Sequence, residues 1–242
     1  MSTRIGRLIQ KNEILKSYEE PLFGKGGQGK LFLDLSCGAR TDVREVVEGL
    51  GNRWVGIDQI GFPGVIKADV HSLPFKNSMF DVVYSAATFE HYYDPWRVAR
   101  EVHRVMKPGG FFCGLIAFLQ PWHGDSYYHF SHLGTRQMLL VSGFEVMDIR
   151  AGNDHGVPYL IQRMFPTPFP VVGKILSLYG SFLVAVRKRT LRLRAKILSY
   201  SNREAMEKRL RFLKDDDLRF AASIIFLARK PESGVKDGHF SP

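Results

Sequence analysis

Cysteine is scarce in this sequence, and long apolar runs are missing. Only Cys37 and Cys113 occur among 242 residues, too few for a disulfide framework, so we expect a reducing, cytoplasmic compartment. No stretch reaches the ~18 consecutive apolar residues that a membrane-spanning helix needs. Residues 1–20 also lack an apolar core of signal-peptide length. These absences favour a cytoplasmic protein that is either soluble or attached to the inner face of a membrane.

Acidic residues are nearly absent from one segment. Residues 187–214 hold eleven Lys or Arg but only two acids, Glu204 and Glu207, which gives this segment a charge of +9. The whole chain carries +10, so the remainder is close to neutral. The basic charge must therefore be explained by this segment and not by the fold.

Short apolar runs alternate with amphipathic helical patterns along the chain. Such alternation with short connections predicts a largely parallel sheet covered on both faces by helices. Helices are expected at 41–51, 94–110 and 135–143, with Asp94 as an N-cap and Pro108, Gly109 and Gly110 as a stop. The expected strands are 30–35, 53–58, 64–69, 79–87, 111–118, 144–149 and 219–228.

The chain is expected to form a single domain over residues 1–242. Residues 1–30 read as a short polar helix and a flexible loop, and residues 151–217 as a helical insertion before the last strand. In sheets of this kind, ligands bind beyond the carboxyl ends of the strands. Four polar residues fall at these ends: Asp34, Asp58, Asp69 and Ser85.

Glycine is missing where a phosphate-binding turn would need it. Between Asp34 and Asp42 only Gly38 occurs, so the Gly-x-Gly-x-x-Gly turn that cradles a pyrophosphate is absent. An acid does stand 20 residues after Gly38, at Asp58, where a ribose would be bound. This combination favours a nucleoside without a pyrophosphate, and S-adenosylmethionine is the natural candidate.

An ordered series of motifs strengthens this interpretation. The stretches "LDLSCGAR", "VGID", "ADVHSLPFKNSMFDVVYSAATFEHYYDP" and "REVHRVMKPGG" follow one another within residues 31–118. Together they resemble class I S-adenosylmethionine-dependent methyltransferases of the ubiquinone-type group, including members of polysaccharide and lipid-linked glycan pathways. The resemblance implies an α/β, Rossmann-like, doubly wound sheet of seven strands with the last strand antiparallel.

The same resemblance implies a set of cofactor-binding residues. Asp58 would hold the ribose hydroxyls, Asp69 and Val70 the adenine, and Ser85 and Ala86 would lie beneath the sulfonium. The methionine part would be lined by Asp34, Ser36, Cys37 and Gly38. The chain departs from the family pattern because Ser36 and Arg40 stand at two glycine positions. Cys37 reads as a packing residue, since nothing near it in the sequence suggests an activated thiolate.

Histidine supplies the candidates for catalysis. A methyl group on a sulfonium is already electrophilic, so the enzyme must mainly align the acceptor and remove its proton. The candidate bases are His91, His123, His129 and His132. The last three, with Asp125, match no standard zinc spacing, and we expect no metal. A loop rich in His and aromatic residues at this place is more typical of a substrate lid.

The acceptor is less clearly indicated than the cofactor. The stretch "YYHFSHLG" and its helix resemble glycan-pathway enzymes. The four histidines around the expected methyl site favour O-methylation, so we expect a hydroxyl of a glycan, a lipid-linked sugar or a small molecule as the acceptor. Tailoring of a secondary metabolite and a non-catalytic cofactor-binding module are the alternatives. A nucleic-acid substrate is disfavoured because "YSAATFEH" replaces the Asn-Pro-Pro-Tyr type of motif after the fourth strand.

The insertion combines an apolar helical face with the basic segment. Apolar residues recur at helical spacing over 171–186, and six Lys or Arg follow directly over 187–196. This pattern is typical of a helix that lies in an anionic membrane surface. The alternative is a helix that packs on the sheet or on a second subunit.

Overall fold

A mixed, seven-stranded sheet forms the centre of the protein. In the computed structural model, the described residues are 3–24, 28–40, 42–120, 124–152, 170–199, 218 and 221–232. Within them the strand order is β3-β2-β1-β4-β5-β7-β6, and β7 pairs antiparallel with both of its neighbours. The strands are β1 Leu31–Leu35, β2 Arg53–Asp58, β3 Ile66–Lys67, β4 Phe80–Ala86, β5 Met106–Ala117, β6 Glu145–Ala151 and β7 Ser223–Arg229. The fold class predicted from the sequence is confirmed.

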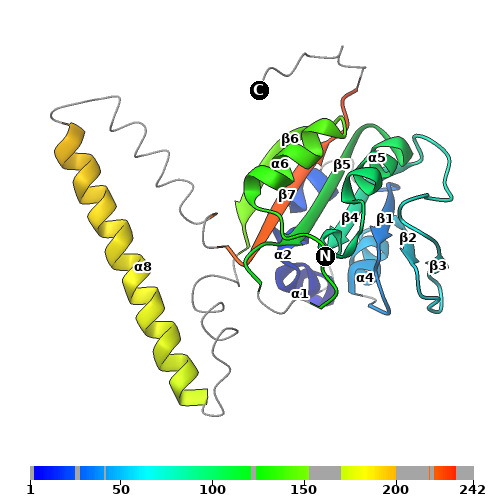
Figure 1. The fold of residues 1–242 in the computed structure, drawn as a ribbon. Coiled ribbons are helices and arrows are strands. Elements are labelled where there is room, and N and C mark those ends of the chain that lie inside the picture. Colours follow the sequence, from blue (N-terminus) through cyan, green and yellow to red (C-terminus); the bar gives the residue numbers. More distant parts are fainter. Residues whose placement is uncertain are drawn as a thin grey trace.

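Helices cover both faces of this sheet (Figure 1). One face packs against α5 and α6 through residues such as Leu33, Phe112 and Val102, and the other against α1, α2 and α4 through residues such as Phe32 and Val46. Neighbouring strand residues point to opposite faces, which is why Phe32 and Leu33 belong to different cores. The helices are α1 Thr3–Lys11, α2 Glu13–Ser17, α3 Glu19–Phe23, α4 Asp42–Gly49, the 3-10 helix η1 Phe89–His91, α5 Pro95–Val105, α6 His132–Val141 and α8 Pro170–Ser199.

The N-terminal segment is more structured than a single polar helix. It forms three short helices, and Ile9, Leu15 and Leu22 are buried against the sheet. Asn12 caps α2 by accepting from the backbone N–H of Leu15 at 3.0 Å and donates to the Tyr84 hydroxyl at 3.0 Å. Apolar side chains spaced along these helices thus complete one core of the domain. The central part of the expected flexible loop lies outside the described residues.

The boundary between α5 and β5 lies earlier than expected. Asp94 caps α5 as predicted, accepting from the Arg97 N–H at 2.9 Å, but the helix ends at Val105 and not at Pro108–Gly110. Met106 is already extended and pairs with Phe80 of β4. Pairing with β4 therefore ends the helix before the Pro-Gly-Gly stop signal is reached. The irregular register that follows accommodates the Pro-Gly-Gly turn.

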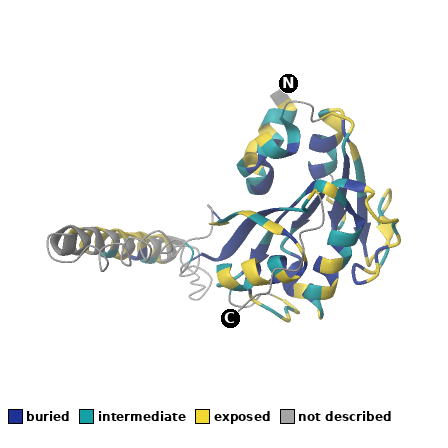
Figure 2. Ribbon diagram, turned by 90° about the horizontal axis from the view of Figure 1, so that it is seen from above, coloured by how far each residue is buried: buried dark blue, intermediate teal, exposed yellow. Residues whose placement is uncertain are grey.

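Helix α8 forms the described part of the insertion. In both views it stands apart from the sheet and its covering helices (Figures 1 and 2). Among its described residues, eight large apolar side chains are exposed: Val172, Ile175, Leu178, Tyr179, Phe182, Leu183, Val186 and Leu193. Among the residues that the structure describes, no helix is both long and apolar enough to cross a membrane.

Candidate active site

The turn after β1 is held by an acid from the neighbouring strand. Asp58, at the end of β2, accepts the Gly38 N–H at 3.0 Å and the Ile60 N–H at 2.8 Å. Parallel pairing brings the two strand ends together, since Leu35 lies beside Ile57. Gly38 has a positive φ of 61°, and a Cβ there would meet nothing within 4 Å. The turn therefore borders open space, with the Asp58 carboxylate fixed beside it.

Ser36 stands where the family pattern has a glycine, and its backbone conformation is strained there. Its φ is 50°, in the left-handed region that non-glycine residues rarely adopt. Its hydroxyl lies 2.8 Å from the hydroxyl of Tyr92, which follows η1. Burial raises the pKa of Tyr92 to about 12, so this phenol stays protonated and able to donate. The hydrogen bond offsets the backbone strain and links the turn after β1 to the segment after β4.

Asp34 and Cys37 are both buried beneath the turn. Asp34 is 4% exposed and accepts from the Trp54 indole at 3.3 Å. Burial raises its pKa to about 7, an effect that the Trp54 hydrogen bond and, less strongly, Arg40 oppose. The pKa of Cys37 is likewise raised by burial, to about 12, so this thiol is not a nucleophile near neutral pH. Cys37 packs near Gly56, which agrees with a packing role.

Asp69 and Val70 follow β3 and have opposite environments. Val70 is buried in the core, whereas the Asp69 side chain is 64% exposed. Asp69 Oδ1 accepts the His71 backbone N–H at 2.9 Å and His71 Nδ1 at 2.7 Å. These bonds hold the pKa of Asp69 below its usual value, the backbone bond most strongly. An ionised carboxylate is thus displayed at the end of β3.

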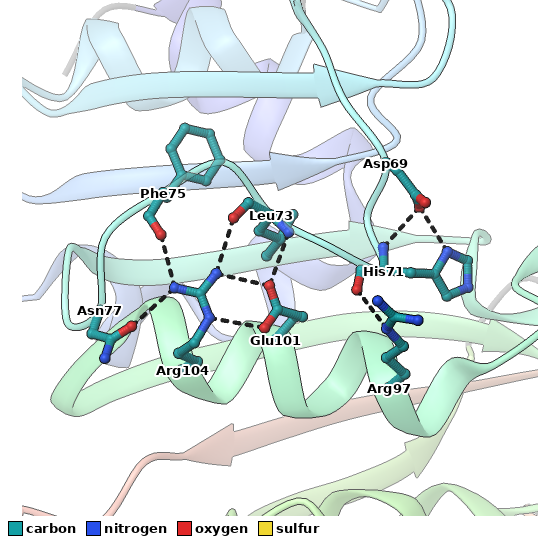
Figure 3. A network of polar contacts seen from close by, with 8 residues as sticks. All are labelled: Asp69, His71, Leu73, Phe75, Asn77, Arg97, Glu101 and Arg104. Carbon is teal, nitrogen blue, oxygen red and sulfur yellow. Dashed lines mark hydrogen bonds and ion pairs between the residues drawn. The ribbon is translucent and has the colours of Figure 1, made fainter.

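A clamp from α5 fixes the chain that follows Asp69 (Figure 3). Arg97 donates to the His71 carbonyl at 2.8 Å. Glu101 accepts the Leu73 N–H at 2.9 Å, and Arg104 donates to the Leu73 carbonyl at 2.9 Å. Arg104 also donates to the Phe75 carbonyl and the Asn77 side chain, at 2.8 and 2.9 Å. The charged face of α5 therefore holds the β3–β4 loop in place.

Sequence reasoning missed this clamp. The pattern over 94–110 predicts a helix and its two ends, but not what its charged face contacts. The available signal was the spacing of Arg97, Glu101 and Arg104, which places three charged groups along one face of a helix. What could not be predicted is that this face meets backbone carbonyls and not water. In the structure, the pKa of Glu101 is lowered mainly by its hydrogen bond with Arg104.

Ser85 and Ala86 at the end of β4 are placed differently from each other. The Ser85 side chain is fully buried, and its hydroxyl lies 2.6 Å from that of Thr88. It supports the turn into η1 and contributes no exposed hydroxyl. Ala86 is partly exposed and remains near the edge where the other strand-end residues gather.

The candidate bases are only partly brought together. His91 is exposed at the end of η1, and a Cβ on Gly124 would lie 3.9 Å from its ring. The loop after β5 is anchored nearby because the Tyr127 N–H donates to the Glu90 carbonyl at 2.7 Å. His129, exposed, has its Nε2 3.0 Å from the Ser126 hydroxyl. The loop therefore passes beside His91.

The other two histidines add less to this cluster. His132 is the first residue of α6, and its Nδ1 is buried without a hydrogen-bond partner. His123 lies outside the described residues. Within the part of the chain that the structure describes, no group of three or more His, Cys, Asp or Glu side chains is arranged to hold a metal ion.

The strand-end residues fit a cationic nucleoside. Asp58 uses one backbone donor on each oxygen, which leaves acceptor capacity for two hydroxyls. Asp69 displays an ionised carboxylate, and Gly38 borders open space. The chain has no glycine-rich cradle for a pyrophosphate. The donors and acceptors present therefore suit a ribose and an amino group better than a dinucleotide.

Comparison with known proteins agrees with this geometry. Residues 32–114 match the family described as "Methyltransferase domain". A sterol 24-C-methyltransferase of Schizosaccharomyces pombe is 26% identical over 208 residues, which cover 72% of this chain and 53% of that relative. The chain thus spans about half the length of this curated relative.

Solved structures share the fold at low sequence identity. A Burkholderia thailandensis 1,6-didemethyltoxoflavin-N1-methyltransferase, with bound S-adenosylhomocysteine, has a TM-score of 0.53 at 14% identity; the match covers 93% of this chain and 82% of that one. The [4+2]-cyclase SpnF also has a TM-score of 0.53, at 18% identity, covering 85% and 76%. The family match supports a class I methyltransferase domain over residues 32–114, and S-adenosylmethionine as the cofactor of that segment. The ubiquinone-type and glycan-pathway subgroup stays a prediction.

Proposed function

We propose that this chain transfers a methyl group from S-adenosylmethionine, which it binds over the carboxyl ends of β1, β2 and β3. The observation that carries the proposal is the Asp58 carboxylate fixed against the Gly38 turn. This contact lies inside the segment that matches the methyltransferase domain family. The bound cofactor supplies an electrophilic methyl group on a sulfonium.

Each strand end contributes one part of the binding site. Asp58 accepts from the ribose hydroxyls, and Asp69 with the Val70 amide binds the adenine. Ser85 supports the turn beneath the sulfonium through Thr88, while Ala86 lines it. The methionine part is bound by the turn after β1, formed by Asp34, Ser36, Cys37 and Gly38. Since Asp58 and Asp69 are held by backbone donors before any ligand arrives, little ordering is needed on binding.

Calorimetric titration with S-adenosylmethionine tests this site. Asp58→Ala should weaken binding by about 2 kcal/mol or more, because the ribose hydroxyls lose a charged acceptor. Asp58→Asn keeps one acceptor oxygen and should lose less. Asp148→Ala, on β6 at the far edge of the sheet, is the matched control, with thermal unfolding to verify folding. Unchanged binding by both Asp58 variants would show that the ligand lies elsewhere.

We infer that the acceptor is a hydroxyl of a glycan, a lipid-linked sugar or a small molecule. A hydroxyl must lose a proton during transfer, and histidine is suited to accept it near neutral pH. The exposed His91, beside the loop that carries His129, supports this role. Replacement of the true base by Ala should lower turnover roughly 10²–10⁴-fold. Full activity in the Ala variants of His91, His123, His129 and His132 would exclude a histidine base.

Transfer to carbon is the competing reaction, and the sterol 24-C-methyltransferase relative favours it. The two are separated by using S-adenosylmethionine with a ¹³C-labelled methyl group. The chemical shift of the labelled product distinguishes a methyl on oxygen from one on carbon. Tailoring of a small secondary metabolite is tested with the same label on small-molecule extracts in place of lipid and glycan fractions.

A module that binds the cofactor without methyl transfer is the second class of function. The fold similarity to a [4+2]-cyclase supports this alternative, because the same architecture occurs in a protein named for a reaction other than methyl transfer. Binding of S-adenosylmethionine without label in any lipid, glycan or small-molecule fraction would favour this class. Labelled product would exclude it.

We propose in addition that α8 attaches the protein to an anionic membrane surface on the cytoplasmic side. Its apolar residues lie three or four positions apart and are exposed, as in Ile175, Leu178 and Phe182. The basic run over 187–196 follows on the same helix. A helix of this kind lies in the interface, and each basic residue there contributes about 1 kcal/mol. The acceptor would then be presented on a lipid.

Sedimentation with vesicles decides this point. Binding to anionic vesicles is expected at low salt, with a loss at high salt and with neutral lipid. Leu178→Glu combined with Phe182→Glu should abolish it, whereas Met147→Glu, at an exposed apolar position on β6, should not. An absence of binding together with a dimer in light scattering would assign α8 to contact with a second copy.

A further inference from the structure

His71 is a buried side chain next to an exposed one. It is 6% exposed, while Asp69, two residues earlier, has a side chain 64% exposed. The imidazole is stacked on the Tyr93 ring with centroids 3.9 Å apart, and it meets the edge of Tyr92 at 5.8 Å. The ring is therefore fixed by two aromatic side chains from the segment after β4.

The same residue determines how Asp69 is oriented. His71 directs two donors, its backbone N–H and ring Nδ1, at the same oxygen, Asp69 Oδ1. Its own carbonyl is held by Arg97 of α5, so neither its main chain nor its ring is free to turn. Figure 3 shows this chain of contacts from α5 through His71 to Asp69. One carboxylate oxygen is thus engaged, and Oδ2 is left for a ligand.

Packing alone does not explain a histidine at this place. Its Nε2 is buried and has no hydrogen-bond partner. A buried polar atom without a partner destabilises a protein, and a phenyl ring would fill the same stack without that cost. What the imidazole adds over a phenyl ring is the Nδ1 donor to Asp69.

We propose that His71 is a positioning residue for the purine of the cofactor. By holding Asp69 Oδ1, it directs Oδ2 toward the 6-amino group of the adenine. This inference rests on the proposed cofactor site, in which Asp69 binds that group. It leads to a specific expectation: His71 should control selectivity for a 6-amino over a 6-oxo purine and not merely the strength of binding.

Titration with two ligands tests the proposal, with S-adenosylhomocysteine as the 6-amino ligand and S-inosylhomocysteine as the 6-oxo ligand. The parent should prefer the 6-amino ligand by roughly tenfold or more, since only an amino group donates to a carboxylate. His71→Phe keeps the aromatic stack but lacks Nδ1, so it should lose most of this preference while binding the 6-oxo ligand as before. His71→Asn offers a side-chain N–H donor without the ring and should retain part of the preference.

The possible results separate the two claims. A His71→Phe variant with the parental preference, or one that binds both ligands more weakly by the same factor, overturns the positioning role and leaves the proposed function intact. A parent that binds neither ligand overturns the proposed function and the role of His71 with it. If His71→Phe fails to fold in thermal unfolding, the preference of His71→Asn decides: a preference below the parental one supports the role, and the parental preference overturns it.

Discussion

The loops at the carboxyl ends of β1 to β4 and the helix α8 are built in opposite ways. The loops after β1 and β3 are held by side chains distant in the sequence, such as Asp58 on Gly38, Tyr92 on Ser36 and Arg104 on Leu73. In α8, by contrast, eight of the described large apolar side chains are exposed. The difference indicates that the domain itself orders these loops, whereas it does not cover the exposed apolar residues of α8.

The sharpest test compares one phenylalanine from each region. Phe112 of β5 is fully buried between aromatic rings, whereas Phe182 of α8 is 62% exposed. Phe112→Ala should lower the free energy of unfolding by about 3–5 kcal/mol because it leaves a cavity. Phe182→Ala should change it by less than about 0.5 kcal/mol. Urea unfolding measures both, and a large loss in Phe182→Ala would show that α8 packs on the domain in solution.

The buried Asp34 should make the stability of the domain depend on pH. Its pKa is about 7 in the folded protein, above the ordinary value of 3.8. A raised pKa means that its contribution is fully present below about pH 4 and is lost as pH rises through 7. Between pH 5 and 8 this loss amounts to about 2–3 kcal/mol, at 1.36 kcal/mol per pH unit. The Asp34→Asn variant should lack this dependence.

Chemical denaturation of Asp34→Asn and the parent at pH 5, 6, 7 and 8 checks this expectation. The variant should gain stability relative to the parent as pH rises. Exposed acids of α4 such as Glu48 provide the control, since Glu48→Gln should follow the parental curve. A constant difference between Asp34→Asn and the parent across this range would contradict the raised pKa.

Removal of the α5 clamp should loosen the loop that carries Asp69. Arg104→Ala leaves the Leu73 and Phe75 carbonyls without their charged donor and should cost about 2 kcal/mol of stability. Hydrogen exchange should increase over residues 69–77. Arg100→Ala, exposed on the same helix, should have no effect on either measurement. Equal exchange in the parent and Arg104→Ala would show that the loop does not depend on α5.

The smallest expected effect concerns the turn after β1. Tyr92→Phe removes the hydroxyl that bonds Ser36 and should cost about 1 kcal/mol in stability. Tyr93→Phe removes a hydroxyl from the neighbouring, largely exposed ring and serves as the control. Ser36→Gly in the Tyr92→Phe background should recover stability, because glycine adopts the positive φ freely. Without that recovery, the bond does not offset strain at Ser36.

Much of the architecture is readable from local pattern. The alternation of apolar runs and amphipathic segments, with Asp94 as a cap, predicted the order and type of the elements from β1 to β7. The strand-end positions of Asp58 and Asp69 follow from the same pattern, because a strand that ends in an acid places it at the carboxyl edge of a parallel sheet. Helix α8 also follows from local spacing, since a helix makes its hydrogen bonds within its own segment.

Contacts between distant segments were decided only by the tertiary structure. Sequence spacing does not reveal that Ser36 meets Tyr92, that Asp34 is buried beside Trp54, or that Arg104 grips the loop after β3. The helix stop signal lies beyond Met106, yet Met106 already belongs to a strand because β4 offers it a pairing partner. The periodicity of apolar residues shows which face of its own helix or strand a residue occupies. Which distant residue packs against that face depends on the order of the strands in the sheet. That order forms only when the whole chain folds.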